Sequence, residues 1–149
     1  MKKKILSLLL VAGLSVSLFA GCGSGAADAD KATAEGGKEA ASDLKIGAIL
    51  IGDETETYSK AHIDGIKEAA KELGIPENNI EWKERIDESE DCYDAAKALV
   101  ADGCTLVISN SYGHQDYIAE AAEEFTDVNF VSMTGDYAAI SGLDNYYNA

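Results

Sequence analysis

From residue 44 onward, the chain alternates between short apolar runs and stretches with helical periodicity. Residues 45–51 form a continuous apolar run, which is typical of a strand buried on both faces of a parallel sheet. Across 58–73 the apolar and small residues recur at helical spacing, and Gly74 and Pro76 supply stop signals. The same order then repeats, with a more polar strand at 80–86, a helix from Ser89, a strand at 105–109, a helix around 118–125 and a strand at 128–133.

Repeated strand and helix segments predict an α/β fold, in which right-handed crossovers build a parallel sheet with helices on both faces. Ligands of such folds bind beyond the carboxyl ends of the strands, where the winding reverses. With the strand order 2-1-3-4, the loops 52–57 and 110–114 are expected to face each other across one crevice. Residues 143–149 predict no further helix or strand, and we interpret their two tyrosines as exposed, which indicates missing protein beyond the end of the chain. The alternative is a small four-stranded domain with a frayed tail.

The first 43 residues lack the pattern of folded protein. Lys2, Lys3 and Lys4 precede the apolar run 5–20, which is the layout of a secretory signal peptide. The segment LFAGC at 18–22 resembles the lipobox of bacterial lipoproteins, and this resemblance implies a leader at 1–21 and lipidation of Cys22. The alternative is an ordinary signal peptide that contains a cysteine. Residues 22–43 are small and charged and predict a flexible linker before a domain at 44–149.

The charge balance narrows the choice of partners. The chain has 12 basic and 27 acidic side chains, a formal charge of −15, and loss of the leader would remove three of the lysines. Nucleic acid is therefore excluded as an expected partner, because each phosphate contact would be made against the field of the whole molecule. Three cysteines are too few for a disulfide scaffold, and we interpret Cys92 and Cys104 as small buried residues too far apart to pair.

Catalytic signatures are absent from the sequence. It has no G-x-S-x-G elbow, P-loop, G-x-G-x-x-G turn or C-x-x-C pair. Its two histidines, His62 and His114, offer little material for a metal site, and His114 with Asp116 lacks a third ligand. We therefore predict a binding protein rather than an enzyme, with no cofactor and no metal.

The loops that follow the strands carry the candidate ligand-binding residues. They combine amides, hydroxyls, aromatic faces and glycines that let backbone approach a ligand. Asp116, at the start of the third helix, has the alternative role of compensating the helix dipole, and Tyr58 has the alternative role of packing on its own helix. The full set is Tyr58, Ser59, Asn110, Ser111, Tyr112, Gly113, Asp116, Thr134 and Gly135.

Three segments carry a resemblance to a known family: KIGAILIGD at 45–53 followed by Tyr58 and AHIDG at 61–65, ADGCTLVISNSYGH at 101–114, and GLDNYYN at 142–148. They resemble the basic membrane protein family of lipid-anchored substrate-binding proteins for ABC importers, which includes receptors for purine nucleosides. The resemblance implies a type I periplasmic-binding-protein fold of two α/β lobes, of which this chain covers most of one. It also implies permease and ATPase subunits as partners and a location on the outer face of the cell membrane.

In the nucleoside-binding members, an aromatic residue after the first strand stacks on the base, and an aspartate four residues after a second aromatic holds the ligand. The resemblance therefore implies that Tyr58 stacks and that Asp116, four residues after Tyr112, accepts ribose hydroxyls. The family's Asp-x-Gly-Phe-Asn signature is replaced here by residues 55–59, with Thr57, Tyr58 and Ser59 in its last three positions. Two alternatives remain at this stage: a sugar or other small neutral solute on the same scaffold, and a cytoplasmic signalling domain of flavodoxin-like fold.

Overall fold

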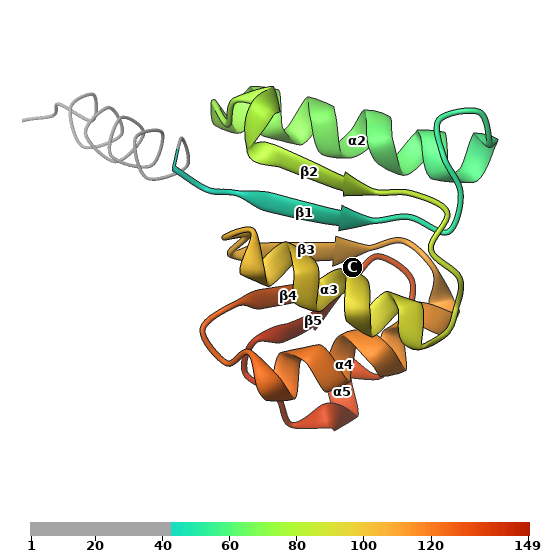
Figure 1. The fold of residues 1–149 in the computed structure, drawn as a ribbon, viewed down its shortest axis with the longest axis vertical. Coiled ribbons are helices and arrows are strands. Elements are labelled where there is room, and N and C mark those ends of the chain that lie inside the picture. Colours follow the sequence, from blue (N-terminus) through green and yellow to red (C-terminus); the bar gives the residue numbers. More distant parts are fainter. Residues whose placement is uncertain (1–42) are drawn as a thin grey trace, which may run out of the picture.

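The structure is a computed structural model, and it describes residues 43–149. Five strands, four helices and two short 3-10 turns alternate along this part of the chain (Figure 1). In order they are β1 Ile46–Ile49, α2 Thr57–Leu73, η1 Glu77–Asn79, β2 Ile80–Lys83, α3 Glu90–Ala101, β3 Leu106–Ser109, η2 Tyr112–His114, α4 Gln115–Glu124, β4 Asn129–Ser132, α5 Ala138–Ser141 and β5 Tyr146–Asn148.

The strands form one sheet in the order β2-β1-β3-β4-β5, and every neighbouring pair is parallel. The predicted α/β class and the predicted order of the first four strands are therefore confirmed. The winding reverses between β1 and β3, because the chain moves outward to β2 from one side of β1 and returns to β3 on the other. This reversal places the loops after β1 and β3 side by side, at the carboxyl edge of the sheet.

Helices cover both faces of the sheet, as predicted, and each face has its own core. Helices α3 and α4 pack on each other and on one face, where Leu99, Val107, Ile118 and Phe130 are fully buried. Helix α2 lies on the other face, over Ile46, Ala48, Ile80 and their neighbours (Figure 1). The two cores fix the sheet, and the sheet in turn fixes the loops at its carboxyl edge.

Local capping explains where the helices begin and end. The side chain of Glu56 accepts hydrogen bonds from the backbone N–H groups of Tyr58 and Ser59, both at 2.7 Å, and starts α2 one residue before the predicted position. Gly74 ends α2 in the left-handed conformation, at φ 77°, which glycine adopts without strain. Ser89 caps α3, as the sequence predicted.

The end of the described chain differs from the expectation. We predicted no element within 143–149 and two exposed tyrosines, but residues 146–148 form β5 and Tyr146 is only 3% exposed. Tyr146 is buried because its hydroxyl lies 3.0 Å from Ser132 Oγ, beneath the cover of α4, while Tyr147 on the other face is exposed as expected. The short helix α5 was also missed, since four residues are too few to show periodicity.

Two further expectations concern strand length and cysteines. The predicted strand 80–86 ends earlier, at Lys83, because Arg85 adopts a positive φ of 58° and turns the chain. Cys92 and Cys104 are both buried and unpaired, as predicted, and burial raises the pKa of the Cys92 thiol to about 12.

The leader 1–21, Cys22 and nearly all of the linker 22–43 lie outside the described residues. Within residues 43–149, no helix is both long enough and apolar enough to cross a bilayer.

Candidate functional site

Three loops meet at the carboxyl edge of the sheet, and the backbone carbonyl of Asn110 is the point where they join. This carbonyl, just after β3, accepts a hydrogen bond from the hydroxyl of Tyr58 at the start of α2. It also accepts a hydrogen bond of 2.9 Å from Thr134 Oγ1, which follows β4. Three of the residues predicted from the sequence are thus brought together from segments as far as 76 residues apart.

Asn110 holds the edge together through its buried side chain. It is 1% exposed, and its Oδ1 accepts a hydrogen bond of 2.9 Å from the backbone N–H of Ile51. Its Nδ2 donates to Ser59 Oγ at 3.2 Å, and the same hydroxyl oxygen accepts from the backbone N–H of Gly52 at 3.1 Å. Ser59 is fully buried as well. Both residues were predicted to bind ligand, but their polar atoms are occupied in joining α2 to β1 and β3.

Tyr58 keeps an exposed face in a fixed position. Its side chain is held at one end by the bond to Asn110 and at the ring by an edge contact with His62, with the centroids 4.7 Å apart and the planes at 71°. Tyr58 is nevertheless 40% exposed. A ring that is already held in place loses little conformational entropy when a flat ligand stacks on it.

Glu88 joins the edge from the loop between β2 and α3. Its carboxylate accepts hydrogen bonds from the hydroxyl of Ser111 and from the backbone N–H of Gly113, the latter at 2.9 Å. These two bonds lower the pKa of Glu88, so the carboxylate stays ionised near neutral pH. A Cβ at residue 113 would lie 2.4 Å from the Glu88 carboxyl carbon, so the approach depends on glycine.

The sequence analysis missed Glu88, although a signal was present. Strand β2 is parallel to β1 and β3, so its carboxyl end lies at the same edge. The loop that follows β2 is therefore also a candidate ligand-binding loop. Ser111 and Gly113, which were predicted, are partly occupied by this unpredicted partner.

A second exposed aromatic region lies where η2 meets the loop after β4. The hydroxyl of Tyr112, a residue 57% exposed, donates to the carboxylate of Asp136 at 3.3 Å. Gln115 Oε1 accepts from the backbone N–H groups of Asp136 and Tyr137, at 3.1 and 3.2 Å, and so shapes the loop. A Cβ at Gly135 would lie 2.8 Å from that same oxygen, so glycine is needed for this packing. Tyr137, which the sequence analysis did not single out, is 36% exposed here.

Asp116 lies in the first turn of α4 and is exposed. No hydrogen bond or ion pair of its side chain is found among residues 43–149. Its position fits dipole compensation, and it also leaves the carboxylate available to a ligand.

Asp53, in the loop after β1, is committed to the protein. It accepts hydrogen bonds from the N–H and hydroxyl of Thr55, at 2.8 and 2.5 Å, and it pairs with Arg85. The bonds from Thr55, followed by those from Arg85, lower the pKa of Asp53 to about 2. This pair joins the loop after β1 to the turn after β2.

His114 is buried beneath the edge rather than exposed as a ligand. It is 0% exposed, and its Nε2 lies 3.0 Å from the carbonyl oxygen of Ile86. Burial lowers its pKa from the ordinary 6.5, because the charged imidazolium loses hydration there. Within residues 43–149 there is no group of three histidine, cysteine or acidic side chains that could hold a metal ion.

We expect the stability of the protein to fall as the pH drops from about 7 to 5. Below its ordinary pKa, His114 binds a proton more readily in the unfolded chain than in the folded one, and protonation therefore favours unfolding. The carboxylates of Glu56 and Glu88 also have lowered pKa values, but their contribution is lost only below about 4.5. Urea denaturation at pH 5, 6 and 7 measures the slope. The variant His114→Gln should reduce it and leave the part contributed by His62, whose pKa burial also lowers. An unchanged slope would contradict this account.

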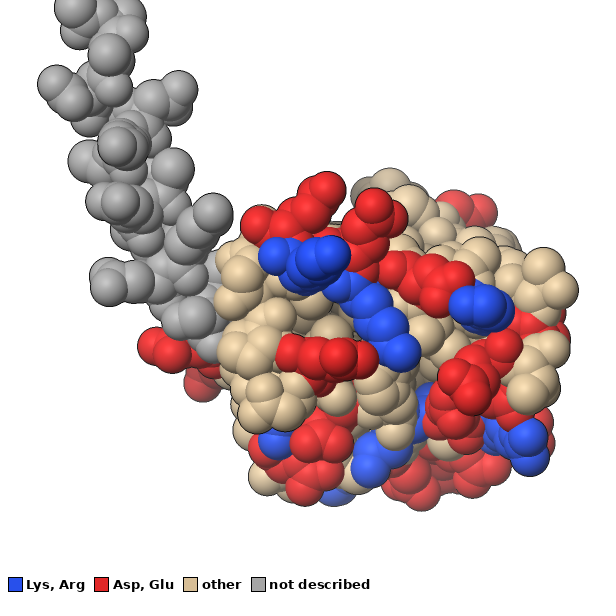
Figure 2. Space-filling view, turned by 90° about the horizontal axis from the view of Figure 1, so that it is seen from above, with Lys and Arg blue, Asp and Glu red and all other residues tan. Residues whose placement is uncertain are grey.

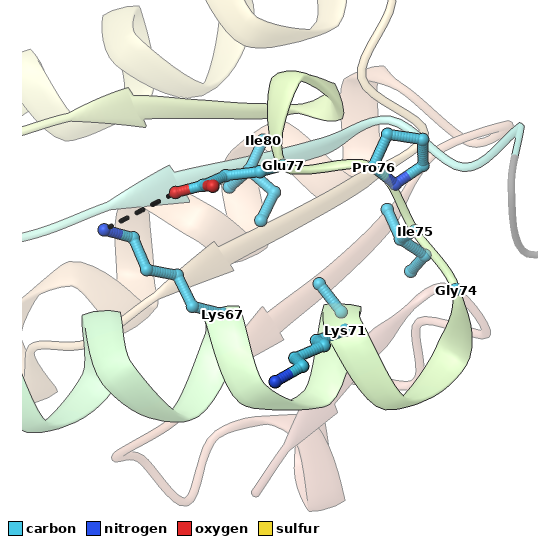
Figure 3. Close-up of a pocket in the computed structure, with 8 residues that line it drawn as sticks. Lys67, Lys71, Gly74, Ile75, Pro76, Glu77 and Ile80 are labelled. Carbon is cyan, nitrogen blue, oxygen red and sulfur yellow. Dashed lines mark ion pairs between the residues drawn. The ribbon is translucent and has the colours of Figure 1, made fainter.

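A separate hollow of about 480 Å³ lies at the opposite end of α2, between the helix terminus and β2 (Figure 3). Lys67 and Glu77 form an ion pair of 3.9 Å at its side, and Gly74, Pro76 and Ile80 line it. Lys71 lies in the last turn of α2, where a cation compensates the helix dipole. These roles explain the charges locally, and the hollow lies away from the carboxyl edge, so we do not assign it to the site.

Taken together, the carboxyl edge offers hydrogen-bond acceptors, hydroxyls and exposed tyrosine rings, without a paired nucleophile and base. Such a surface can bind a small solute that carries donor groups and a flat ring. Several predicted residues are available or partly available to such a solute. They are Tyr58, Tyr112, Thr134 and Asp116, together with the edges of Ser111, Gly113 and Gly135. Asn110 and Ser59 support the surface from below.

Comparison with known proteins gives matches by structure only. No family model and no curated protein matches the sequence. An ABC transporter solute-binding protein from Conexibacter woesei DSM 14684 superposes with a TM-score of 0.60 at 19% identity, over 70% of this chain and 34% of that chain.

Two regulatory proteins share the fold. A transcriptional activator of the comK gene from Bacillus halodurans has a TM-score of 0.52 at 20% identity, over 62% of this chain and 30% of that one. A transcription repressor of the LacI family from Corynebacterium glutamicum has a TM-score of 0.50 at 18% identity, over 69% and 42%. The chain thus spans about a third of the solute-binding protein that it matches. It has the fold found in periplasmic binding proteins and LacI-type regulators.

Proposed function

We propose that this chain is the first lobe of an extracytoplasmic, lipid-anchored solute-binding protein of an ABC importer, and that the importer's solute is a purine nucleoside. The observation that carries the proposal is the meeting of Tyr58 and Thr134 at the Asn110 carbonyl, at the point where the sheet reverses its winding. It puts an exposed, fixed aromatic ring at the place where ligands of this fold bind.

The chemistry of the edge favours a neutral ligand over an anionic one. Glu88, Asp116 and Asp136 carry negative charge here, and the charge of Arg85 is engaged by Asp53. Vicinal ribose hydroxyls can donate to a carboxylate, and a purine can stack on a tyrosine, whereas a phosphate would be repelled. The similarity to a solute-binding protein supports the transport role, and the lipobox-like segment ending at Cys22 supports the anchor.

Calorimetry on the full-length protein with adenosine, guanosine, ribose and adenine tests the proposal. We expect nucleosides to bind and Asp116→Ala to weaken them tenfold to a hundredfold, since a hydrogen bond to a charged group contributes roughly 1.5 to 3 kcal/mol. Tyr58→Ala should cost about 1 to 3 kcal/mol through lost stacking, whereas Tyr58→Phe should keep most of the affinity.

The matched control for Asp116→Ala is Asp127→Ala, an exposed acid between α4 and β4 at the opposite edge of the sheet. It removes the same charge and should leave binding unchanged. Tight binding of ribose or another sugar, with no response to any nucleoside, would replace the nucleoside assignment with a sugar receptor on the same scaffold.

A further inference from the structure

The loop between β2 and α3 is tied to its neighbours where it reaches the carboxyl edge. The backbone N–H of Arg85 donates to the carbonyl oxygen of Gly52 at 3.0 Å. On the other side, the carbonyl oxygen of Ile86 lies 3.0 Å from His114 Nε2. These contacts join the loop to the segments after β1 and after β3. Glu88 therefore reaches the edge from a backbone that is held on both sides.

One oxygen of Glu88 makes both contacts to the loop after β3. Oε1 accepts a hydrogen bond from the hydroxyl of Ser111 and, at 2.9 Å, one from the backbone N–H of Gly113. Donors of this kind form short, strong hydrogen bonds with the oxygen atoms of anions. Oε2 makes no hydrogen bond or ion pair within residues 43–149, and Glu88 is exposed. The carboxylate thus occupies two donors and leaves one acceptor open.

The charge of Glu88 has no cationic partner within the same residues. The loops that follow β1, β2, β3 and β4 contain a single basic residue, Arg85, and its guanidinium is bound by Asp53. After Lys97 the sequence has no lysine or arginine at all. Lysines do lie among carboxylates on the side of α2, which Figure 2 shows. At the carboxyl edge, by contrast, the charge of Glu88 is left uncompensated.

Holding the loops together does not require this charge. A glutamine at residue 88 could accept the same two hydrogen bonds through its amide oxygen. In a chain of formal charge −15, a further unpaired carboxylate is repelled by the other acids, so charge alone disfavours it. What a carboxylate adds over an amide is repulsion of an anionic solute and stronger hydrogen bonds from a neutral one.

We propose that Glu88 is a specificity-determining residue of the proposed binding site. Its Oε1 occupies the donors of Ser111 and Gly113, its Oε2 accepts a hydrogen bond from a hydroxyl or amine of a neutral solute, and its charge excludes the phosphorylated form of that solute. The inference rests on the proposed function, because it concerns the solute bound at the same edge. It adds the class of compound that the receptor rejects, namely nucleoside phosphates and other anions.

Calorimetry on the full-length protein compares adenosine with adenosine 5′-phosphate, and ribose with ribose 5-phosphate. Glu88→Gln removes the charge but keeps an acceptor for Ser111 and Gly113, so its stability in urea should stay close to that of the wild type. We expect this variant to raise the affinity for the phosphorylated compound relative to its neutral partner about tenfold, the effect of one close like charge. The change should shrink as added salt screens the charge.

The matched control is Glu84→Gln, an exposed acid of the same loop without a hydrogen bond or ion pair in the described part of the chain. It removes the same charge four residues earlier and should leave the ratio of the two affinities nearly unchanged. A ratio that does not respond to Glu88→Gln, or that responds equally to Glu84→Gln, would overturn the proposal and leave Glu88 with a structural role only.

The two proposals can fail separately. Binding of ribose without any nucleoside would replace the solute of the proposed function, and the ribose pair would then give the same ratio. If the wild type binds none of these compounds, the proposed function fails and inorganic phosphate becomes the probe. Glu88→Ala frees the donors of Ser111 and Gly113, so phosphate should raise the unfolding temperature of this variant at constant ionic strength, but not that of the wild type. No response of Glu88→Ala to phosphate would overturn the role of Glu88 as well.

Discussion

Replacing Asn110 with alanine is expected to lower the free energy of unfolding by about 2 to 4 kcal/mol and to abolish ligand binding. The substitution leaves the N–H of Ile51 without its acceptor and removes one of the two hydrogen bonds that the Ser59 hydroxyl accepts, in a region where Asn110 is 1% exposed. An unsatisfied buried donor costs about 1 to 3 kcal/mol, and the small cavity adds to this. The joint between α2, β1 and β3 would loosen, and the backbone carbonyl of residue 110, which holds the Tyr58 hydroxyl, would shift with it.

Ser59→Ala is the graded control, because it removes only the weaker arm of the same joint. It should cost about 1 to 2 kcal/mol, since Gly52 and Asn110 each lose one hydrogen bond while the bond from Ile51 to Asn110 remains. Urea denaturation of both variants measures the difference. If Asn110→Ala costs no more than Ser59→Ala, the bond to Ile51 is not the main tie.

The fold could be predicted from the sequence because its strands and helices have clear patterns of apolar residues, as continuous runs or at helical spacing. An apolar run at 45–51 and helical spacing at 58–73 specify a buried parallel strand and an amphipathic helix. The parallel crossovers then leave few topologies, and the observed order β2-β1-β3-β4-β5 contains the predicted one. Strand β5 was missed because three residues carry no period, and the burial of Tyr146 is decided by Ser132 and the cover of α4.

The candidate site was only partly predictable. The sequence located the loops that meet at the carboxyl edge, because strand ends are visible in the pattern, but it could not tell an exposed side chain from a buried one that ties loops together. Asn110 and Ser59 illustrate this: both are polar and in the right loops, and both are buried. Glu88 shows the reverse: its contact with Gly113 joins residues 25 apart, so the only signal for it is the position of its loop at the carboxyl end of β2.

The carboxyl edge combines buried residues that hold the loops with exposed residues above them, and this arrangement supports the proposed binding role. Buried polar groups at Asn110, Ser59 and Gln115 hold the loops, and the tyrosines above them stay exposed. A preorganised surface loses less entropy on binding than a mobile one. Variants of the buried residues should therefore reduce stability and affinity together. Asp116→Ala should leave stability nearly unchanged, whereas Tyr58→Phe should cost about 0.5 to 1.5 kcal/mol of stability through the lost bond to the Asn110 carbonyl.

The second large effect is expected where α3 packs against β1. Leu99 is fully buried, and a Cβ at Gly47 would lie 2.7 Å from Leu99 Cδ1 and 3.0 Å from its Cβ. Leu99→Ala should cost about 2 to 5 kcal/mol through lost burial and the cavity that remains. Gly47→Ala should cost about 1 to 3 kcal/mol, because the new methyl group cannot fit without moving the leucine.

Combining the two substitutions should cost less than the sum of the single effects. The methyl group at residue 47 would occupy part of the space that Leu99→Ala empties, so each change relieves the strain or the cavity made by the other. We expect a favourable coupling of about 0.5 to 3 kcal/mol, the range for residues in direct contact. Urea denaturation of the wild type, both single variants and the double variant measures it. Strict additivity would mean that α3 shifts away from β1 in the Gly47→Ala variant, and that close packing at this glycine does not fix the position of the helix.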